Sequence, residues 1–203
     1  MVEGKATLHR GLREVYIDRT KSSFIDGKAG KLLYRGYNID DLAQNCSFEE
    51  TVYLVMNGEL PTKQQLQNFD EELKRNRNVS EDIIQIIKLI KDAHPMDVLR
   101  TSISAMAAFD PDVNDNSEEA TLRKGMRLTA QAPSVVALHA RIRDGKEPIL
   151  PDPKLGHAAN FLYMLFGELP HPEDAKLLDR DFVLHAEHGL NASSFAARVS
   201  AST

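Results

Sequence analysis

The spacing of apolar residues separates a short region with a period of two from a long region with a helical period. Residues 12–17 read as an extended stretch that leads to Asp26-Gly27, a dipeptide typical of tight hairpin turns. Leu32, Leu33 and Tyr34 would form the return strand. The pattern therefore predicts a small β-hairpin before Arg35.

From Asp40 onward the apolar residues recur at the helical period. Ser47 with Glu50, and Thr62 with Gln65, have the spacing of capping boxes, in which each side chain satisfies a free backbone donor of the first turn. Each pair therefore predicts the start of a helix.

Six further helical segments follow from start and stop signals of the same kind. We expect one helix opened by Ser80 and one opened by Pro95, the latter with Met96, Leu99, Ile103 and Met106 facing inward. After a polar loop over 110–117, a long helix should run to about Arg143, with a break or kink at Pro133. The last part of the chain should form a helix from about His157 to Phe166 stopped by Gly167, a helix from Pro172 to about His188, and an amphipathic stretch from near Asn191 with Phe195 and Val199 on one face.

Composition describes a soluble chain of 203 residues, with 42% hydrophobic and 27% charged residues. A net charge of -5 gives no electrostatic reason to expect a nucleic-acid partner. The single cysteine, Cys46, cannot form an intramolecular disulfide. The polar first ten residues and the short apolar runs predict neither a signal peptide nor a membrane span, which favours the cytoplasm.

The densest cluster of chemically competent side chains is His185-Ala186-Glu187-His188, followed by Asn191 and two serines. If the helix continued to His188, the two imidazoles would share one face beside the free N–H groups of the next helix, which could seat a small carboxylate. A structural histidine pair is the alternative. A metal site is a third reading, but its spacing is not that of metalloproteases and no further ligand is evident.

The remaining polar candidates have simpler interpretations. In His94-Pro95-Met96-Asp97 we expect His94 to cap a helix and Asp97 to interact with its dipole, with Arg100 solvated or paired. We interpret Arg35 and Arg77 as surface residues and His139 and His157 as packing residues.

Several motifs resemble those of bacterial and archaeal citrate and 2-methylcitrate synthases, in the same order, from about residue 11 to the last residue. The motifs are Tyr34-Arg35-Gly36-Tyr37-Asn38-Ile39-Asp40-Asp41-Leu42-Ala43, Gly58-Glu59-Leu60-Pro61, His94-Pro95-Met96-Asp97-Val98-Leu99-Arg100, Ala159-Asn160-Phe161-Leu162-Tyr163-Met164 and His185-Ala186-Glu187-His188 with Asn191-Ala192-Ser193. Glu187 and Ser194 stand where the family often has Asp and Thr, which leaves the substrate branch open.

The resemblance implies a mostly α fold and a homodimer. The chain would be the N-terminal part of the large helical domain, with a β-hairpin region over 10–37 and helices over 38–203, truncated before the small CoA-binding domain. It also implies condensation of acetyl-CoA with oxaloacetate to give citrate and CoA, or of propionyl-CoA in the methylcitrate branch. The CoA thioester is a substrate, and no cofactor, metal, nucleic acid or membrane is expected.

Among the site residues, the resemblance implies that His188 contacts the keto acid, with His185 and Asn191 in the same motif. The catalytic histidine and aspartate are expected beyond Thr203, so that this chain would contain no catalytic residue and be inactive alone. A non-catalytic helical module that dimerises is the alternative function.

Overall fold

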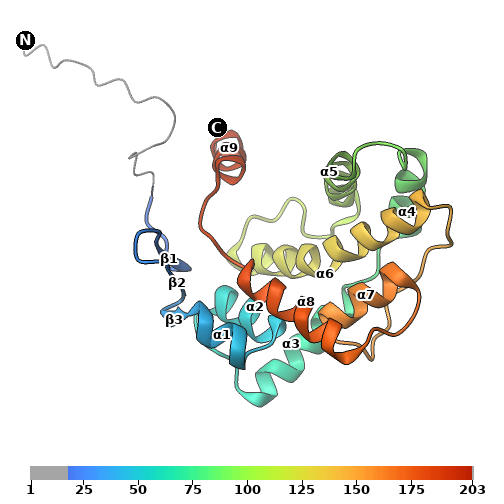
Figure 1. Ribbon diagram of the computed structural model, residues 1–203. Coiled ribbons are helices and arrows are strands. Elements are labelled where there is room, and N and C mark those ends of the chain that lie inside the picture. Colours follow the sequence, from blue (N-terminus) through green and yellow to red (C-terminus); the bar gives the residue numbers. More distant parts are fainter. Residues whose placement is uncertain (1–17, 203) are drawn as a thin grey trace, which may run out of the picture.

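The predicted hairpin is present at the N-terminal end of residues 18–202, the part of the chain that the computed structural model describes (Figure 1). Strand β1 (Ser23–Asp26) pairs antiparallel with β2 (Lys31–Tyr34). The Asp26 carboxylate accepts two backbone N–H groups of the turn, at 3.0 and 3.1 Å, which fixes the reversal. The extended stretch predicted over Leu12, Val15 and Ile17 lies outside the described residues.

The structure adds a third strand that the pattern did not predict. β3 (Tyr37–Asn38) pairs antiparallel with β2 and gives the sheet the order β1-β2-β3. The chain reverses between β2 and β3 through Arg35 and Gly36, which both have positive φ. The Arg35 side chain donates two hydrogen bonds to the carbonyl of Val55, at 2.7 and 3.1 Å, and so is tied to a helix and not free at the surface.

All other elements are helical, as the period predicts. They are α1 (Ile39–Asn45), α2 (Phe48–Asn57), α3 (Lys63–Arg75), α4 (Glu81–Leu89), α5 (Pro95–Met106), the 3-10 turn η1 (Ala107–Phe109), α6 (Glu118–Arg143), α7 (His157–Phe166), α8 (Pro172–Leu184) and α9 (Ala192–Ala201).

The local helix signals in the sequence act as expected. Both capping boxes form: the Ser47 hydroxyl accepts the N–H of Glu50 at 3.2 Å, and the Glu50 carboxylate accepts the N–H of Ser47 at 2.7 Å. Thr62 and Gln65 make the same reciprocal pair at the start of α3. At the other end of α7, Gly167 adopts the left-handed conformation, with φ at 89°.

The core is divided among three clusters that meet at α2 and α6. Figure 1 shows α6 crossing the middle of the body, with α4, α5 and α7 towards one end and the sheet towards the other. Ile87, Val98 and Leu138 are fully buried between α4, α5 and α6, and Leu73 packs α3 on α2 and α6. Tyr34 of β2 joins α1, α2 and α8 in the third cluster, which ties the sheet to the helices.

One expected helix face was wrong, and of the break or kink expected at Pro133 the break is absent. Met96, predicted to face inward, is 63% exposed, because in α5 the buried face is carried by Val98, Ser102 and Met106. α6 is not broken at Pro133 and continues to Arg143. The packing of the helix on its neighbours holds the helical conformation, although Pro133 has no backbone N–H to donate.

The extent of α8 also differs from the expectation. The helix ends at Leu184 and not near His188, with His185 as its C-cap. The N–H of His185 still donates to the Asp181 carbonyl, at 3.1 Å, but the next N–H, of Ala186, turns to the carbonyl of Val183. The chain then leaves the helix for a loop that contacts the sheet.

Candidate functional site

The loop over residues 185–191 holds every site residue that the sequence analysis selected. It connects α8 to α9, which stands apart from the other helices in Figure 1. Gly189 has φ at 77°, which reverses the chain direction within the loop. Asn191 is the N-cap of α9, so the loop ends at a helix N-terminus.

His185 does not share a helical face with His188, contrary to the expectation. Its Nδ1 lies 2.8 Å from the backbone carbonyl of Asp181 and 3.4 Å from the Asp181 carboxylate, so the ring folds back on the end of α8. The predicted pairing failed because the helix on which it depended ends at Leu184. His185 instead borders a groove between α2, α6 and α8, described below.

His188 and Asn191 retain unused hydrogen-bonding groups. His188 is exposed and forms no hydrogen bond or ion pair with any residue of 18–202. The Asn191 side-chain oxygen accepts the N–H of Ser194 at 2.8 Å, while its amide nitrogen has no partner among those residues. In the first turn of α9 the N–H groups of Ala192 and Ser193 have no intrahelical acceptor. These groups are donors that suit a carboxylate or ketone oxygen.

Contacts with residues near the N-terminus hold the start of this loop and the helix α9 that follows it. The buried Tyr34 hydroxyl donates to the carbonyl of Leu184 at 3.1 Å, and burial raises the pKa of Tyr34. Arg198, in the last turn of α9, pairs with Asp18, and its hydrogen bond lowers the pKa of that carboxyl. No local pattern in the sequence signals these contacts, because their partners are more than a hundred residues apart.

Arg77 differs most from its expected position among the charged residues, because it was expected at the surface. Arg77 is fully buried and not at the surface. One N–H donates to the carbonyl of Leu155 at 2.7 Å, while Nε and Nη2 have no partner among residues 18–202. Burial lowers the pKa of Arg77, and the charges of Glu49 and Asp70 oppose that effect. Arg77 thus fastens the connector before α7 to the loop between α3 and α4.

The two histidines interpreted as packing residues are buried, which confirms that interpretation. His139 is 5% exposed, and its Nε2 lies 2.9 Å from the carbonyl of Lys91. His157 is 4% exposed, and its ring lies 5.0 Å from that of Phe48, centroid to centroid. Burial, and then the charge of Arg77, lowers the pKa of His157 to about 4, so this imidazole is neutral near pH 7.

The cluster at the start of α5 is a helix cap, as expected. His94 Nδ1 accepts the N–H of Met96 at 3.2 Å. Asp97 lies in the first turn and pairs with Arg100 at 3.1 Å, with both side chains largely exposed. Capping and ion pairing therefore explain the positions of His94, Asp97 and Arg100, and no bound ligand is needed to explain them.

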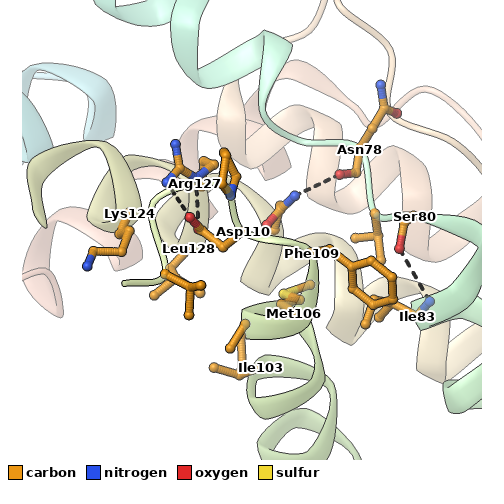
Figure 2. A pocket seen from close by; sticks show the side chains of 15 residues that line it. Asn78, Ser80, Ile83, Ile103, Met106, Phe109, Asp110, Lys124, Arg127 and Leu128 are labelled. Atoms are coloured by element: carbon orange, nitrogen blue, oxygen red, sulfur yellow. Dashed lines mark hydrogen bonds and ion pairs between the residues drawn. The ribbon is translucent and has the colours of Figure 1, made fainter. Parts of the chain in front are cut away.

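A cavity of about 440 Å³ lies between α4, α5 and α6, but the charged side chains that line it are already engaged. Figure 2 shows Arg127 turned to the Asp110 carboxylate, with Met106 and Phe109 on the apolar side. Arg127 also binds Asp112 at 2.7 Å, and Lys124 donates to a backbone carbonyl. The cavity therefore offers an apolar surface but no free charged group among its lining residues.

A second hollow adjoins the candidate loop. This groove, of about 550 Å³, lies between α2, α6 and α8 and is mainly apolar, with Phe48, Leu122, His157, Phe182 and His185 among its lining residues. Within residues 18–202 no group of three or more His, Cys, Asp or Glu side chains is arranged to hold a metal ion. In the same range, no helix combines the length and the apolar composition needed to cross a bilayer.

Comparisons with known proteins agree with the resemblance noted in the sequence. The family described as "Citrate synthase, C-terminal domain" matches residues 11–203. The citrate synthase of Haloferax volcanii is 47% identical, over 97% of this chain and 53% of the relative. The 2-methylcitrate synthase of Mycobacterium tuberculosis is 42% identical, over 100% of this chain and 51% of the relative.

Solved structures show the same likeness in three dimensions. The crystal structure of the citrate synthase from Pyrobaculum aerophilum superposes with a TM-score of 0.90 at 39% identity, over 94% of this chain and 50% of that one. The citrate synthase from Thermotoga maritima gives 0.82 at 33% identity over the same shares. The chain thus spans about half the length of the relatives that it matches, and within that span its sequence and fold place it in the citrate synthase family.

Proposed function

We propose that this chain contributes the keto-acid site to an enzyme that condenses acetyl-CoA with oxaloacetate to give citrate and CoA. The observation that carries the proposal is the unengaged imidazole of His188 beside the free donors at the N-terminus of α9, in a chain of this family. A relative named citrate synthase that is 47% identical supports the reaction.

In this proposal His188 donates a hydrogen bond to the ketone oxygen of oxaloacetate. The N–H groups of Ala192 and Ser193, with the Asn191 amide, would hold a carboxylate through the positive end of the α9 dipole. Such donors stabilise the negative charge that grows on the ketone oxygen as the carbon–carbon bond forms. His185, held against Asp181, would bound the site without contacting the ketone.

The reaction joins the methyl carbon of the thioester, as its enol, to the ketone carbon, and the ketone oxygen takes up a proton. Water then cleaves the thioester and CoA leaves. General acid and base groups are needed to form the enol, and we place them in the half of the relatives' length that this chain does not span. Domain closure would exclude water until both substrates are bound. No cofactor is required, since the CoA thioester is a substrate.

The choice of acyl group is the second candidate. A relative named 2-methylcitrate synthase matches the whole chain at 42% identity, so propionyl-CoA is the alternative thioester. Both reactions use the same keto acid, and the proposed role of His188 is the same in each. We further propose a homodimer without a nucleic-acid or membrane partner. A non-catalytic helical dimerisation module would keep the fold without binding the keto acid.

The proposal is tested by titrating the 203-residue chain with oxaloacetate while following the histidine side chains by NMR. We expect the His188 ring signals to shift with added oxaloacetate. In His188→Ala, loss of a hydrogen bond to a charged ligand is expected to weaken binding by roughly 10- to 150-fold, from about 1.5–3 kcal/mol.

His139→Ala is the matched control. His139 is buried and bonded to a backbone carbonyl, so its removal should lower the melting temperature and leave oxaloacetate affinity within about twofold of the parent chain. His188→Ala should do the reverse. If His188→Ala lowers the melting temperature but leaves the affinity unchanged, or if the His188 signals do not move with oxaloacetate, the proposed keto-acid site is wrong.

A further inference from the structure

A single carboxylate oxygen ties the candidate loop to the sheet. Oε1 of Glu187 accepts the Ser23 hydroxyl at 3.0 Å, the Ser22 hydroxyl at 3.3 Å and the backbone N–H of Gly189 at 2.7 Å. Two of these donors come from the start of the hairpin, more than 160 residues away in the sequence. Glu187 forms no ion pair within the described residues, so neutral donors alone balance its charge there.

This contact is unusual in the loop because the neighbouring residues have little else to hold them. Apart from Glu187, no side chain of residues 186–190 forms a hydrogen bond with a described residue outside the loop. His188, Gly189 and Leu190 are exposed. Ala186 packs against the core cluster that includes Tyr34 and Val183, which fixes the chain just before Glu187. The orientation of the residues after Glu187 therefore depends on its carboxylate.

The internal bond to Gly189 determines how His188 is presented. The carboxylate of residue 187 accepts the N–H of residue 189, which closes a tight turn with His188 at its centre. Gly189 suits this turn because its φ of 77° is strained for other residues. A Cβ added at Gly189 would lie 3.9 Å from the Ser23 hydroxyl oxygen, an ordinary van der Waals contact, so the backbone conformation and not lack of space favours glycine here.

We propose that Glu187, held by Ser22 and Ser23, is a positioning residue that fixes the turn presenting His188 to the keto acid. This inference rests on the proposed function for the role of His188. It gives the N-terminal hairpin a part in the site: Ser23 of β1 and Ser22 just before it supply the two hydroxyl groups that orient the loop. An acceptor oxygen at the end of a side chain of this length is the required feature, and the negative charge strengthens its bonds.

The first measurement uses the 203-residue chain without ligand. Glu187→Ala, and the double substitution Ser22→Ala with Ser23→Ala, remove the anchor from its two sides. Both should speed hydrogen exchange of the Gly189 amide by about tenfold or more and move the His188 ring signals in the NMR spectrum. Glu187→Gln keeps an acceptor oxygen at the same position and should restore both observables most of the way to those of the parent chain.

Asp26→Ala is the matched control. It removes a hairpin carboxylate that also accepts two N–H groups, but in the turn between β1 and β2 and without contact to the loop. It should lower stability and leave Gly189 exchange and the His188 signals unchanged. If Asp26→Ala changes them as much as Glu187→Ala does, the effect is general loosening, and the positioning role is overturned.

The second measurement is oxaloacetate titration of the same variants. Glu187→Ala and the double serine variant should weaken binding several-fold, and Glu187→Gln less. Unchanged exchange and unchanged His188 signals in Glu187→Ala overturn the positioning role whatever the titration gives. Ligand-free changes of the expected kind, with no oxaloacetate binding even by the parent chain, support the anchor but refute the proposed function, so the two failures are distinct.

Discussion

Lowering the pH from 7 to 4 should titrate a buried histidine and a partly buried aspartate that face the same region and affect stability in opposite directions. His157 begins α7, and its ring lies 5.0 Å from that of Phe48 and 6.0 Å from that of Phe182. Burial, and then the charge of Arg77, lowers its pKa from 6.5 to about 4. The Nδ1 atom is buried and has no partner within the described residues.

The sign for His157 follows from proton uptake in each state. The unfolded chain binds a proton on this imidazole below its ordinary pKa of 6.5, whereas the folded protein does so only below about 4. Stability is therefore complete above pH 6.5 and is lost progressively as the pH falls to about 4. At about 1.4 kcal/mol per pKa unit, the loss is about 2 kcal/mol by pH 5 and about 3 kcal/mol by pH 4.

Asp179 acts in the opposite direction. Burial raises the pKa of this carboxyl from 3.8 to about 6, and the charges of Glu49 and Glu50 raise it further, against a hydrogen bond from the N–H of Phe48 at 3.2 Å. The folded protein takes up this proton below about pH 6 and the unfolded chain only below about 3.8. The contribution of Asp179 to stability therefore rises as the pH falls through that window and masks part of the loss due to His157.

Two substitutions separate these contributions. His157→Phe keeps a ring of similar size between its neighbours and removes the acid-induced loss of stability. The unfolding free energy of this variant minus that of the parent chain should therefore rise by about 2 kcal/mol as the pH falls from 7 to 5. Asp179→Asn removes the opposing gain and should make the decline steeper. Urea unfolding followed by circular dichroism at a series of pH values measures both.

Glu59→Gln is the control, because Glu59 is exposed and has no partner within the described residues. Its stability should follow that of the parent chain at every pH. If the His157→Phe curve also runs parallel to that of the parent between pH 7 and 4.5, the buried imidazole is not the source of acid sensitivity, and the reasoning fails.

Three further substitutions test the fold by urea unfolding near pH 7. Ser47→Ala removes half of a capping box and should lower the unfolding free energy by about 1 kcal/mol; no change would mean that the cap is dispensable. Gly167→Ala should destabilise more than Gly58→Ala: both have φ near 90°, but a Cβ at Gly167 would lie 3.0 Å from an arginine side chain, whereas Gly58 faces open space. Leu54→Ala, at a fully buried site, should lower the unfolding free energy by about 2–5 kcal/mol, and a loss below 1 kcal/mol would contradict its place in the core.

Most helix starts and several ends could be predicted from the sequence because their causes are local. Ser47 with Glu50 forms a capping box within four residues of chain, and Gly167 stops α7 through its own backbone conformation. The hairpin followed from Asp26-Gly27, whose carboxylate bonds close to it in the chain. Motif order likewise identified the family, which the comparisons confirm.

Properties that depend on distant partners could not be predicted in this way. A helical pattern continues past Leu184, but the chain leaves the helix where Tyr34 takes the Leu184 carbonyl and the hairpin serines take Glu187, so His185 and His188 do not form the expected helical pair. The composition around Arg77 resembles that of a surface segment, yet its contact with the carbonyl of Leu155 lies inside the protein.

The physical distinction is one of range. Backbone hydrogen bonds and caps act over three or four residues, so a linear pattern contains both partners, and the two hairpin strands, most helices and the candidate motif at 185–191 follow from the chain alone. Burial and side-chain anchoring join residues that are 78 positions apart, as in Arg77 with Leu155, or 164 positions apart, as in Ser23 with Glu187. Only the folded arrangement brings such partners together, and it is this arrangement that ends α8 early, buries Arg77 and His157, and leaves His188 unengaged beside α9.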